Sequence, residues 1–227
     1  MYSLILLNGG IGKRAAAGRP KQLVDVNGIP ILVYSLVAAD AVESITQIVL
    51  NFPPGWRDDV ERVVTDYAIK TPVVLVEAGA TRHESVARML GECTEAHVVV
   101  HESARPIVTT ADFEKLIADP NANVSYMLPI SFTVAPVEPG SHRVTGSLDR
   151  STLRNVQLPQ KFEKATLEAG HAYAKTQGLV FTEDATLCAV AGADVFFLEG
   201  DDRNIKVTTP LDVRIAGFLL GPVWADE

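Results

Sequence analysis

The sequence predicts an α/β fold: a three-layer sandwich around a mostly parallel, Rossmann-like central sheet, with a protruding β-arm for dimerisation. Three observations support this prediction. Apolar runs of strand length alternate with amphipathic helical stretches, which is typical of crossover units in a parallel sheet. With 47% hydrophobic and 21% charged residues, the composition is that of a globular protein. A chain of 227 residues is long enough to bury one core, so we expect a single domain over residues 1–227.

The individual elements follow from these runs. Strands are predicted at residues 4–7, 45–52, 73–77, 97–101, 125–129 and 195–199. Helices are predicted at residues 30–39, 58–67, 82–91, 111–118, 164–176 and 210–220. Pro30 and Pro210 suit the first turn of a helix, where the missing N–H leaves no hydrogen bond unmade. Because ligands bind beyond the carboxyl ends of such strands, the loops that follow the strands are the candidates for a functional site.

One segment, residues 132–160, breaks this alternation. It contains Pro136, Pro139, Gly140 and Gly146 and shows no helical period. We interpret it as an extended arm that leaves the main body. An arm that cannot bury itself packs on another subunit, so the sequence predicts a homodimer.

The overall charge limits the partners. The net charge of −8 would repel nucleic acid and anionic membranes, so neither is expected to bind. No apolar run is long enough to span a membrane, and the chain opens directly into a strand rather than a signal peptide. Cys93 and Cys188 are too far apart for a metal or redox pair and are interpreted as free structural thiols. These features predict a cytoplasmic protein.

The loop after the first strand is rich in glycines and cations. It contains Gly9, Gly10, Gly12, Lys13, Arg14, Arg19 and Lys21. Glycines allow backbone N–H groups to close on a bound anion, and four clustered cations repel one another unless a polyanion lies between them. The loop therefore predicts a site for a nucleoside triphosphate.

Other interpretations of this loop remain open. A dinucleotide-binding turn would indicate a nicotinamide-dependent reductase, although Pro20 interrupts the helix that such a turn requires. A Walker-type loop needs a hydroxyl where Arg14 stands. A nucleotidyltransferase loop would use Arg14 and Lys21 to hold the triphosphate, since phosphoryl chemistry depends mainly on positioning and positive charge. A catalytically silent nucleotide-binding module or a merely solvated basic turn are the remaining alternatives.

A small-residue turn, residues 78–81, follows the third predicted strand. It would let the backbone approach a flat base, with Ser85 hydrogen-bonding the edge of that base. Alternatively, Thr81 and Glu84 form an ordinary capping box at the start of the next helix.

Two further segments carry candidate polar residues. After the fourth strand, Glu102 could hold a sugar hydroxyl or a metal and Arg105 a phosphate, or the two could form a structural ion pair. Late in the chain, Ile205 and Val207 are of buried type, which leaves Lys206 pointing the other way on a short strand. There it could complete a ring of cations with the first loop, or be a solvated lysine of an edge strand.

Together these motifs resemble the 2-C-methyl-D-erythritol 4-phosphate cytidylyltransferases and the related ribitol 5-phosphate cytidylyltransferases, from about Ser3 to Leu220. The matching pieces are residues 9–14 and 20–22, Arg82 with Ser85-Val86, His101 with residues 104–106, Asp149-Arg150, Gln157 with Pro159-Gln160, Thr182 with Asp184-Ala185, and residues 204–208. The resemblance implies one nucleotidyltransferase domain that transfers CMP from CTP to a small polyol phosphate, in isoprenoid biosynthesis, and releases diphosphate.

The resemblance also implies roles for individual residues. Arg14, Lys21 and Lys206 would be catalytic and contact the phosphates. The nucleotide would be bound by Asn8, Gly9, Gly10, Gly12, Gly79, Ala80, Ser85 and Ala104. The acceptor would be bound by Glu102, Arg105, Thr133, Arg150 and Thr182, with Arg150 reaching across the dimer. Mg²⁺ would be held mostly by the triphosphate, with Glu102 as the candidate protein ligand.

The departures from the family pattern lie mainly on the acceptor side. Glu102 stands where family members usually have Asp, Phe132 replaces a carboxylate, and Leu158 replaces a threonine. Asn8 and Ala80 differ in the nucleotide loops. The best expectation for the acceptor is 2-C-methyl-D-erythritol 4-phosphate. Ribitol 5-phosphate, or a small phosphonate such as a hydroxyalkylphosphonate, is the alternative.

Overall fold

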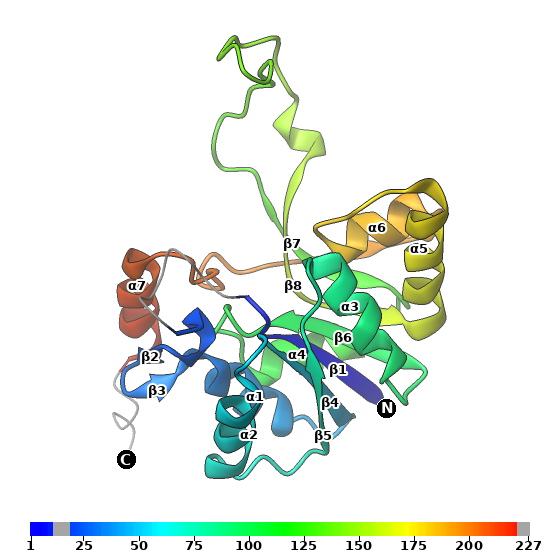
Figure 1. Ribbon diagram of the computed structural model, residues 1–227. Coiled ribbons are helices and arrows are strands. Elements are labelled where there is room, and N and C mark those ends of the chain that lie inside the picture. Colours follow the sequence, from blue (N-terminus) through cyan, green and yellow to red (C-terminus); the bar gives the residue numbers. More distant parts are fainter. Residues whose placement is uncertain (11–18, 222–227) are drawn as a thin grey trace.

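The computed structural model describes residues 1–10 and 19–221, and it confirms the α/β class. Seven strands form one sheet in the order β5-β4-β1-β6-β8-β7-β9 (Figure 1). Four neighbouring strands run parallel: β5 (Val73–Glu77), β4 (Ile45–Phe52), β1 (Tyr2–Leu7) and β6 (His97–Glu102). Next to them, β8 (Arg154–Glu163) is antiparallel to β6 and to β7 (Val124–Pro129), and β9 (Phe196–Glu199) pairs parallel with β7.

Helices cover both faces of this sheet, as the apolar strands predict. Leu4 and Leu6 of β1 face a cluster with α1 (Ile31–Asp40), α2 (Arg57–Asp66) and α4 (Thr110–Ala118). Ile5 and Leu7 face the opposite cluster with α3 (Arg82–Gly91), α5 (Lys164–Gln177) and α6 (Asp184–Val190). Because successive side chains of a strand point to opposite faces, a strand that is apolar throughout requires a layer on each side.

A third, smaller cluster lies beside the main sheet. There α7 (Pro210–Leu220) packs with the hairpin of β2 (Asp25–Val26) and β3 (Ile29–Pro30), through Val26, Ala216 and Val207. Pro210 begins α7, as predicted, and Thr209 caps it by accepting a hydrogen bond from the N–H of Asp212. This cluster brings the segment around Val207 next to the chain that follows the glycine loop.

The arm differs from the prediction at its C-terminal boundary. Residues 130–153 leave the body, with a single bridge between Val137 and Val144, whereas residues 154–163 return as β8 in the middle of the sheet (Figure 1). The strand was missed because it carries buried amides. Gln160 Nε2 donates to Ser125 Oγ at 2.9 Å, and Gln157 Nε2 donates to the Asp201 carbonyl at 3.0 Å. Helix α6 was also missed, because seven residues are too few to show a period.

Two further expectations can be compared with the described residues. Both cysteines are free and buried, and burial raises the pKa of each thiol to about 12, which makes them unreactive. No helix in residues 1–10 and 19–221 is long and apolar enough to cross a membrane.

Candidate active site

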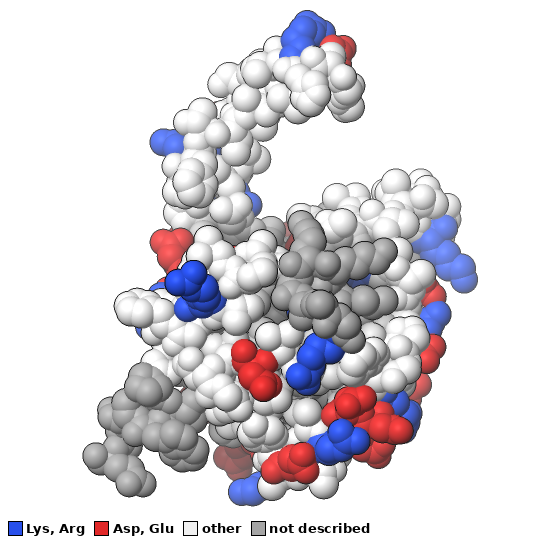
Figure 2. Space-filling view, turned by 60° about the vertical axis from the view of Figure 1, so that its left-hand side comes forward, with Lys and Arg blue, Asp and Glu red and all other residues white. Residues whose placement is uncertain are grey.

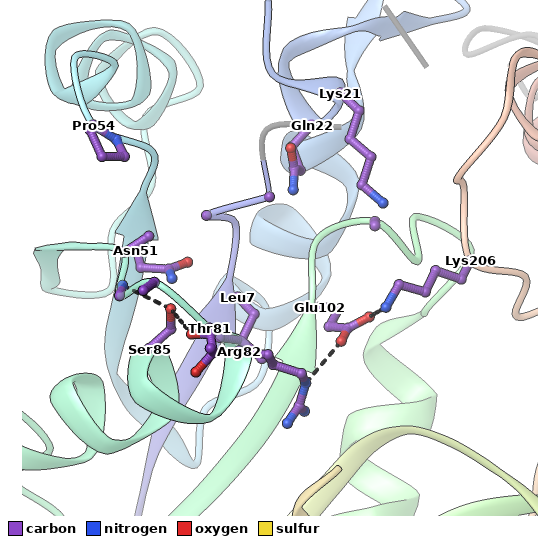
Figure 3. A pocket seen from close by; sticks show the side chains of 16 residues that line it. Leu7, Lys21, Gln22, Asn51, Pro54, Thr81, Arg82, Ser85, Glu102 and Lys206 are labelled. Carbon is purple, nitrogen blue, oxygen red and sulfur yellow. Dashed lines mark hydrogen bonds and ion pairs between the residues drawn. The ribbon is translucent and has the colours of Figure 1, made fainter. Parts of the chain in front are cut away.

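A cavity of about 630 Å³ opens at the carboxyl ends of β1, β4, β5 and β6 (Figure 3). This is the edge at which ligands bind in open α/β sheets. The residues that line it come from the loops after these four strands and from two distant segments. They are Leu7, Gly9, Gly10, Lys21, Gln22, Asn51, Pro54, Ala78, Gly79, Ala80, Thr81, Arg82, Ser85, Glu102, Ala104 and Lys206.

Two lysines from opposite ends of the sequence meet in this cavity. Lys21 begins the short 3₁₀ helix Lys21–Leu23, and its Nζ donates to the Val207 carbonyl at 2.9 Å. Lys206, the neighbour of that carbonyl, places its Nζ 2.5 Å from Glu102 Oε2 (Figure 3). Both lysines thus line the same cavity, as a ring of cations around one ligand would require. However, Lys206 is not on a strand: residues 204–208 have no regular secondary structure, although the Val207 N–H donates to the Ala104 carbonyl at 2.7 Å.

Glu102 is held between two cations. Arg82 Nε donates to Glu102 Oε1 at 3.1 Å, and Arg82 Nη2 donates to Asp184 Oδ2 at 2.7 Å. Burial alone would raise the pKa of Glu102, but Lys206 and Arg82 outweigh it and lower the pKa to about 2. The carboxylate is therefore ionised at neutral pH. The structural ion pair considered for Glu102 exists, but its partners are Arg82 and Lys206 rather than Arg105.

The glycines form a narrow part of the cavity. A Cβ on Gly9 would overlap Ala78 Cβ, and a Cβ on Gly79 would lie 2.8 Å from Glu84 Cβ. Ser85 Oγ accepts from the Gly79 N–H at 3.0 Å and donates to the Thr81 carbonyl at 2.9 Å. Ser85 thus fixes the loop after β5, while Thr81 accepts from the Glu84 N–H and caps α3. The Thr81 half of the predicted capping box is therefore present, but Glu84 Oε2 accepts from the Ala80 N–H rather than from the Thr81 N–H that a capping box requires. Ser85 lines the cavity, and that it bonds the edge of a base stays a prediction.

Asn8 and Asn51 lie next to Gly9, at the start of the glycine-rich loop. Asn8 is fully buried, its N–H donates to Asn51 Oδ1, and its Oδ1 accepts from Ser103 Oγ at 2.8 Å. Asn8 therefore contacts Asn51 and does not line the cavity itself. Asn51, which the sequence did not indicate, lies on the cavity wall at the end of β4.

The structure brings together most of the predicted phosphate and nucleotide residues but, of the five predicted acceptor residues, only Glu102. Gly9, Gly10, Gly79, Ala80, Ser85 and Ala104 line the cavity with Lys21, Glu102 and Lys206. Arg14 and Gly12 lie outside the described residues. Arg105 is directed elsewhere, its Nη1 donating to the Asn204 carbonyl at 2.7 Å. Thr133 and Arg150 lie exposed on the arm, and Thr182 is exposed before α6.

Arg82, Gln22 and Asp184 stand in the matching family motifs, but the sequence assigned none of them a role in the site. The position of Arg82 immediately after the small-residue turn was a signal, because a helix N-terminus beside a sheet edge faces the ligand region. Nothing in the sequence indicates that Asp184 pairs with Arg82, from which it is 102 residues away.

The cavity does not contain a preformed cage for a metal ion. Among the described residues, no group of three or more His, Cys, Asp or Glu side chains could hold a metal, and Glu102 is the one carboxylate that lines the cavity there. Mg²⁺ usually binds through one or two carboxylates together with substrate phosphates. The donor set therefore fits a metal that arrives with a triphosphate.

Comparison with known proteins identifies relatives over the whole chain. The family model described as 2-C-methyl-D-erythritol 4-phosphate cytidylyltransferase matches residues 2–222. A protein of that name from Bacillus cytotoxicus is 36% identical over 97% of this chain and 98% of its own length. One from Synechococcus elongatus is 34% identical over 96% of this chain and 95% of its own length.

Solved structures agree with this match. The 2-C-methyl-D-erythritol 4-phosphate cytidylyltransferase from Thermus thermophilus superimposes with a TM-score of 0.75 at 29% identity, covering 96% of this chain and 98% of that one. The 4-diphosphocytidyl-2C-methyl-D-erythritol synthase from Anaerococcus prevotii gives a TM-score of 0.84 at 23% identity, covering 97% and 96%. At that lower identity the likeness supports the fold.

Proposed function

The chain belongs to the 2-C-methyl-D-erythritol 4-phosphate cytidylyltransferase family, and from this membership we propose that it is a CTP-dependent cytidylyltransferase acting on 2-C-methyl-D-erythritol 4-phosphate. A phosphate oxygen of the acceptor attacks the α-phosphorus of CTP. The new P–O bond forms as the bond between the α-phosphorus and the bridging oxygen breaks, and diphosphate leaves with the electron pair. The reaction belongs to isoprenoid biosynthesis in the cytoplasm.

The observation that carries this proposal is the meeting of Lys21 and Lys206 at one cavity beyond the parallel strands. An entering phosphate and a triphosphate are both anions, so the reaction needs fixed positive charge where they approach each other. Lys21 and Lys206 supply two charges from different segments, and Arg14 is proposed to supply a third. Their role is to stabilise the extra negative charge of the pentavalent α-phosphate.

The glycine-lined part of the cavity is proposed to hold the nucleoside. Its walls, formed by Gly9, Gly10 and Gly79, approach too closely for side chains, which suits a flat base. The loop that carries Gly79 and Ala80 is held by Ser85 and Glu84, since Glu84 Oε2 accepts from the Ala80 N–H at 2.9 Å. Ser85 thus orients the backbone groups that would face cytosine. Ala104 lines the same cavity, and Asn8 is proposed to act indirectly, through its hydrogen bond to Asn51 on the cavity wall.

We place the acceptor at the open side of the same cavity, near Glu102, with Arg105, Thr133, Arg150 and Thr182 as the proposed contacts. In one chain Thr133 and Arg150 lie on the arm, away from the cavity. A homodimer in which each arm serves the partner's site would bring them there. The arm suits such a contact, because Phe132, Val137 and Val144 are 78%, 57% and 61% exposed and charged residues are few on the arm face of Figure 2.

Mg²⁺ is the proposed cofactor. When bound to the triphosphate it would neutralise part of the charge that an incoming phosphate meets. Glu102 is the candidate protein ligand. Its two oxygens already pair with Arg82 and Lys206, so a metal would share one of these oxygens with a cation or displace that cation.

The direct test is a diphosphate-release assay with CTP, Mg²⁺ and 2-C-methyl-D-erythritol 4-phosphate, run beside ATP, GTP and UTP. Ribitol 5-phosphate and short hydroxyalkylphosphonates replace the acceptor in parallel reactions. We expect the highest kcat/KM with CTP and the methylerythritol phosphate. Higher turnover with another acceptor would reassign the substrate. Tight NADPH binding with no CTP turnover would instead support the reductase alternative.

A further inference from the structure

Four charged side chains alternate in sign from the core to the cavity. Asp184 contacts Arg82 at 2.7 Å, Arg82 contacts Glu102 at 3.1 Å, and Glu102 contacts Lys206 at 2.5 Å (Figure 3 shows the last two contacts). The exposed fraction of the side chain is 2% for Asp184, 11% for Glu102 and 42% for Lys206. The row is therefore fixed at its buried end and open at the lysine.

The buried end is held by secondary structure. Asp184 is the first residue of α6, and the side chain of Glu183 caps that helix by accepting from the N–H groups of Ala185 and Thr186. Arg82 is the first residue of α3, capped by Thr81. Two capped helix starts thus hold the guanidinium and its carboxylate partner in place at the end of β6.

The two oxygens of Glu102 are divided between two cations. If Glu102 had Lys206 as its one partner, the ammonium would form a closed pair and lose much of its attraction for an incoming anion. Arg82 takes one oxygen, so that Lys206 shares a carboxylate that is already partly neutralised. Asp184 in turn balances the buried guanidinium, which could otherwise draw Glu102 away from Lys206.

We propose that Arg82 and Asp184 are positioning residues of the CTP site, which set the place and the effective charge of Lys206 through Glu102. This inference rests on the proposed function, because CTP is the anion that Lys206 is expected to meet. The row of four side chains is neutral as a whole. Removing the charge of Arg82 leaves it at −1, and removing that of Asp184 leaves it at +1, so the two substitutions act on anion binding with opposite sign.

The test compares Arg82→Gln with Asp184→Asn. The dissociation constant for CTP is measured by calorimetry without acceptor, and kcat by diphosphate release. We expect Arg82→Gln to weaken CTP binding about tenfold or more, the scale of one lost charge in a partly buried site. Asp184→Asn should bind CTP as tightly as the wild type or more tightly, while kcat falls about tenfold because Lys206 is no longer held in place.

Three more variants separate positioning from folding. Arg82→Lys keeps the charge but not the two-armed contact, so CTP affinity should return while kcat stays low. Glu102→Gln removes a negative charge and should not weaken the binding of CTP measured without Mg²⁺, where no metal contact of Glu102 is lost; it tests the same row if Asp184→Asn fails to fold. Arg62→Gln is the matched control, since it also removes an arginine that pairs with a carboxylate, Asp59 at 3.4 Å, on the exposed face of α2. It should behave as the wild type.

The outcomes separate this inference from the proposed function. If the wild type turns over CTP and the two substitutions change CTP affinity in the same direction, a general loosening of the site explains both and the inference is wrong. Wild-type affinity in Arg82→Gln would also overturn it. A wild-type protein that neither binds nor turns over CTP would overturn the proposed function and the inference together.

Discussion

Replacing Lys21 by alanine separates the chemistry of the cavity from the stability of the fold. In the folded protein the Lys21 Nζ donates a partly buried hydrogen bond of 2.9 Å to the Val207 carbonyl. Such a bond contributes about 1 kcal/mol to the free energy of unfolding. For a chain of this size we expect Lys21→Ala to lower Tm by roughly 2–4 °C.

The expected effect on catalysis is much larger. A fixed donor directed at the charge that develops in a transition state contributes about 3–4 kcal/mol, so its removal lowers kcat roughly 10²- to 10³-fold. The assay is diphosphate release at saturating CTP and acceptor, with Tm measured on the same samples. Lys21→Ala should therefore lower kcat strongly and Tm only slightly.

Lys164 provides a matched control for Lys21. Its Nζ also donates to a backbone carbonyl, that of Cys93 at 2.7 Å, but on the helix α5, away from the cavity. Lys164→Ala should lower Tm by a similar amount and keep turnover within about twofold of the wild type. If Lys21→Ala keeps more than about a tenth of wild-type turnover, or if Lys164→Ala loses as much, the electrostatic role assigned to Lys21 is wrong.

Three further predictions concern the nucleotide-binding loop after β5, the pH dependence of stability and the dimer. In Gly79→Ala the new Cβ would lie 2.8 Å from the Cβ and Cγ of Glu84, so the loop must move. We expect KM for CTP to rise about tenfold. An unchanged KM would show that this loop does not bind the nucleotide. Burial lowers the pKa of His101 from 6.5 to about 3, so the unfolded chain binds the proton first as the pH falls below 6.5, and stability decreases with it. His101→Gln should flatten the pH dependence of urea unfolding between pH 6 and 4 by up to about 1.4 kcal/mol per pH unit, and an unaltered slope would contradict this. If Arg150 acts across a dimer, mixing equal amounts of Arg150→Ala and Lys21→Ala subunits should restore roughly a quarter of wild-type turnover, because half of all dimers are then mixed and each mixed dimer has one intact site of two; no recovery after verified subunit exchange would argue against the shared site.

Much of the fold was predictable because its signals are local. Each residue of β1 from Leu4 to Leu7 is apolar, and a strand buried on both faces needs this pattern, so the sandwich could be recognised before any contact was known. The same holds for the helix starts at Thr81 and Pro210, where the residue type itself stabilises the first turn.

The sequence-based prediction fails where polar side chains are buried. Gln157 and Gln160 lie inside the sheet on β8, but their amides mimic a loop until their partners on β7 and in the segment after β9 are known. The arm was therefore extended into β8 because the polar residues of this strand resemble those of an exposed loop. For Lys206, the structure agrees that its side chain lies outside the core while Val207 is buried, but the predicted short strand is not formed.

The sequence by itself determined the α/β alternation of most strands and helices, the glycine-rich composition of the first loop and the family pattern, because neighbouring residues decide backbone conformation and periodic burial. Tertiary structure alone decided that Lys206 and Arg82 share Glu102, and that Asp184 balances Arg82 from 102 residues away. A charged side chain has no preferred partner along the chain. Its partner is the group that folding leaves within a few ångströms of it in a region with little water.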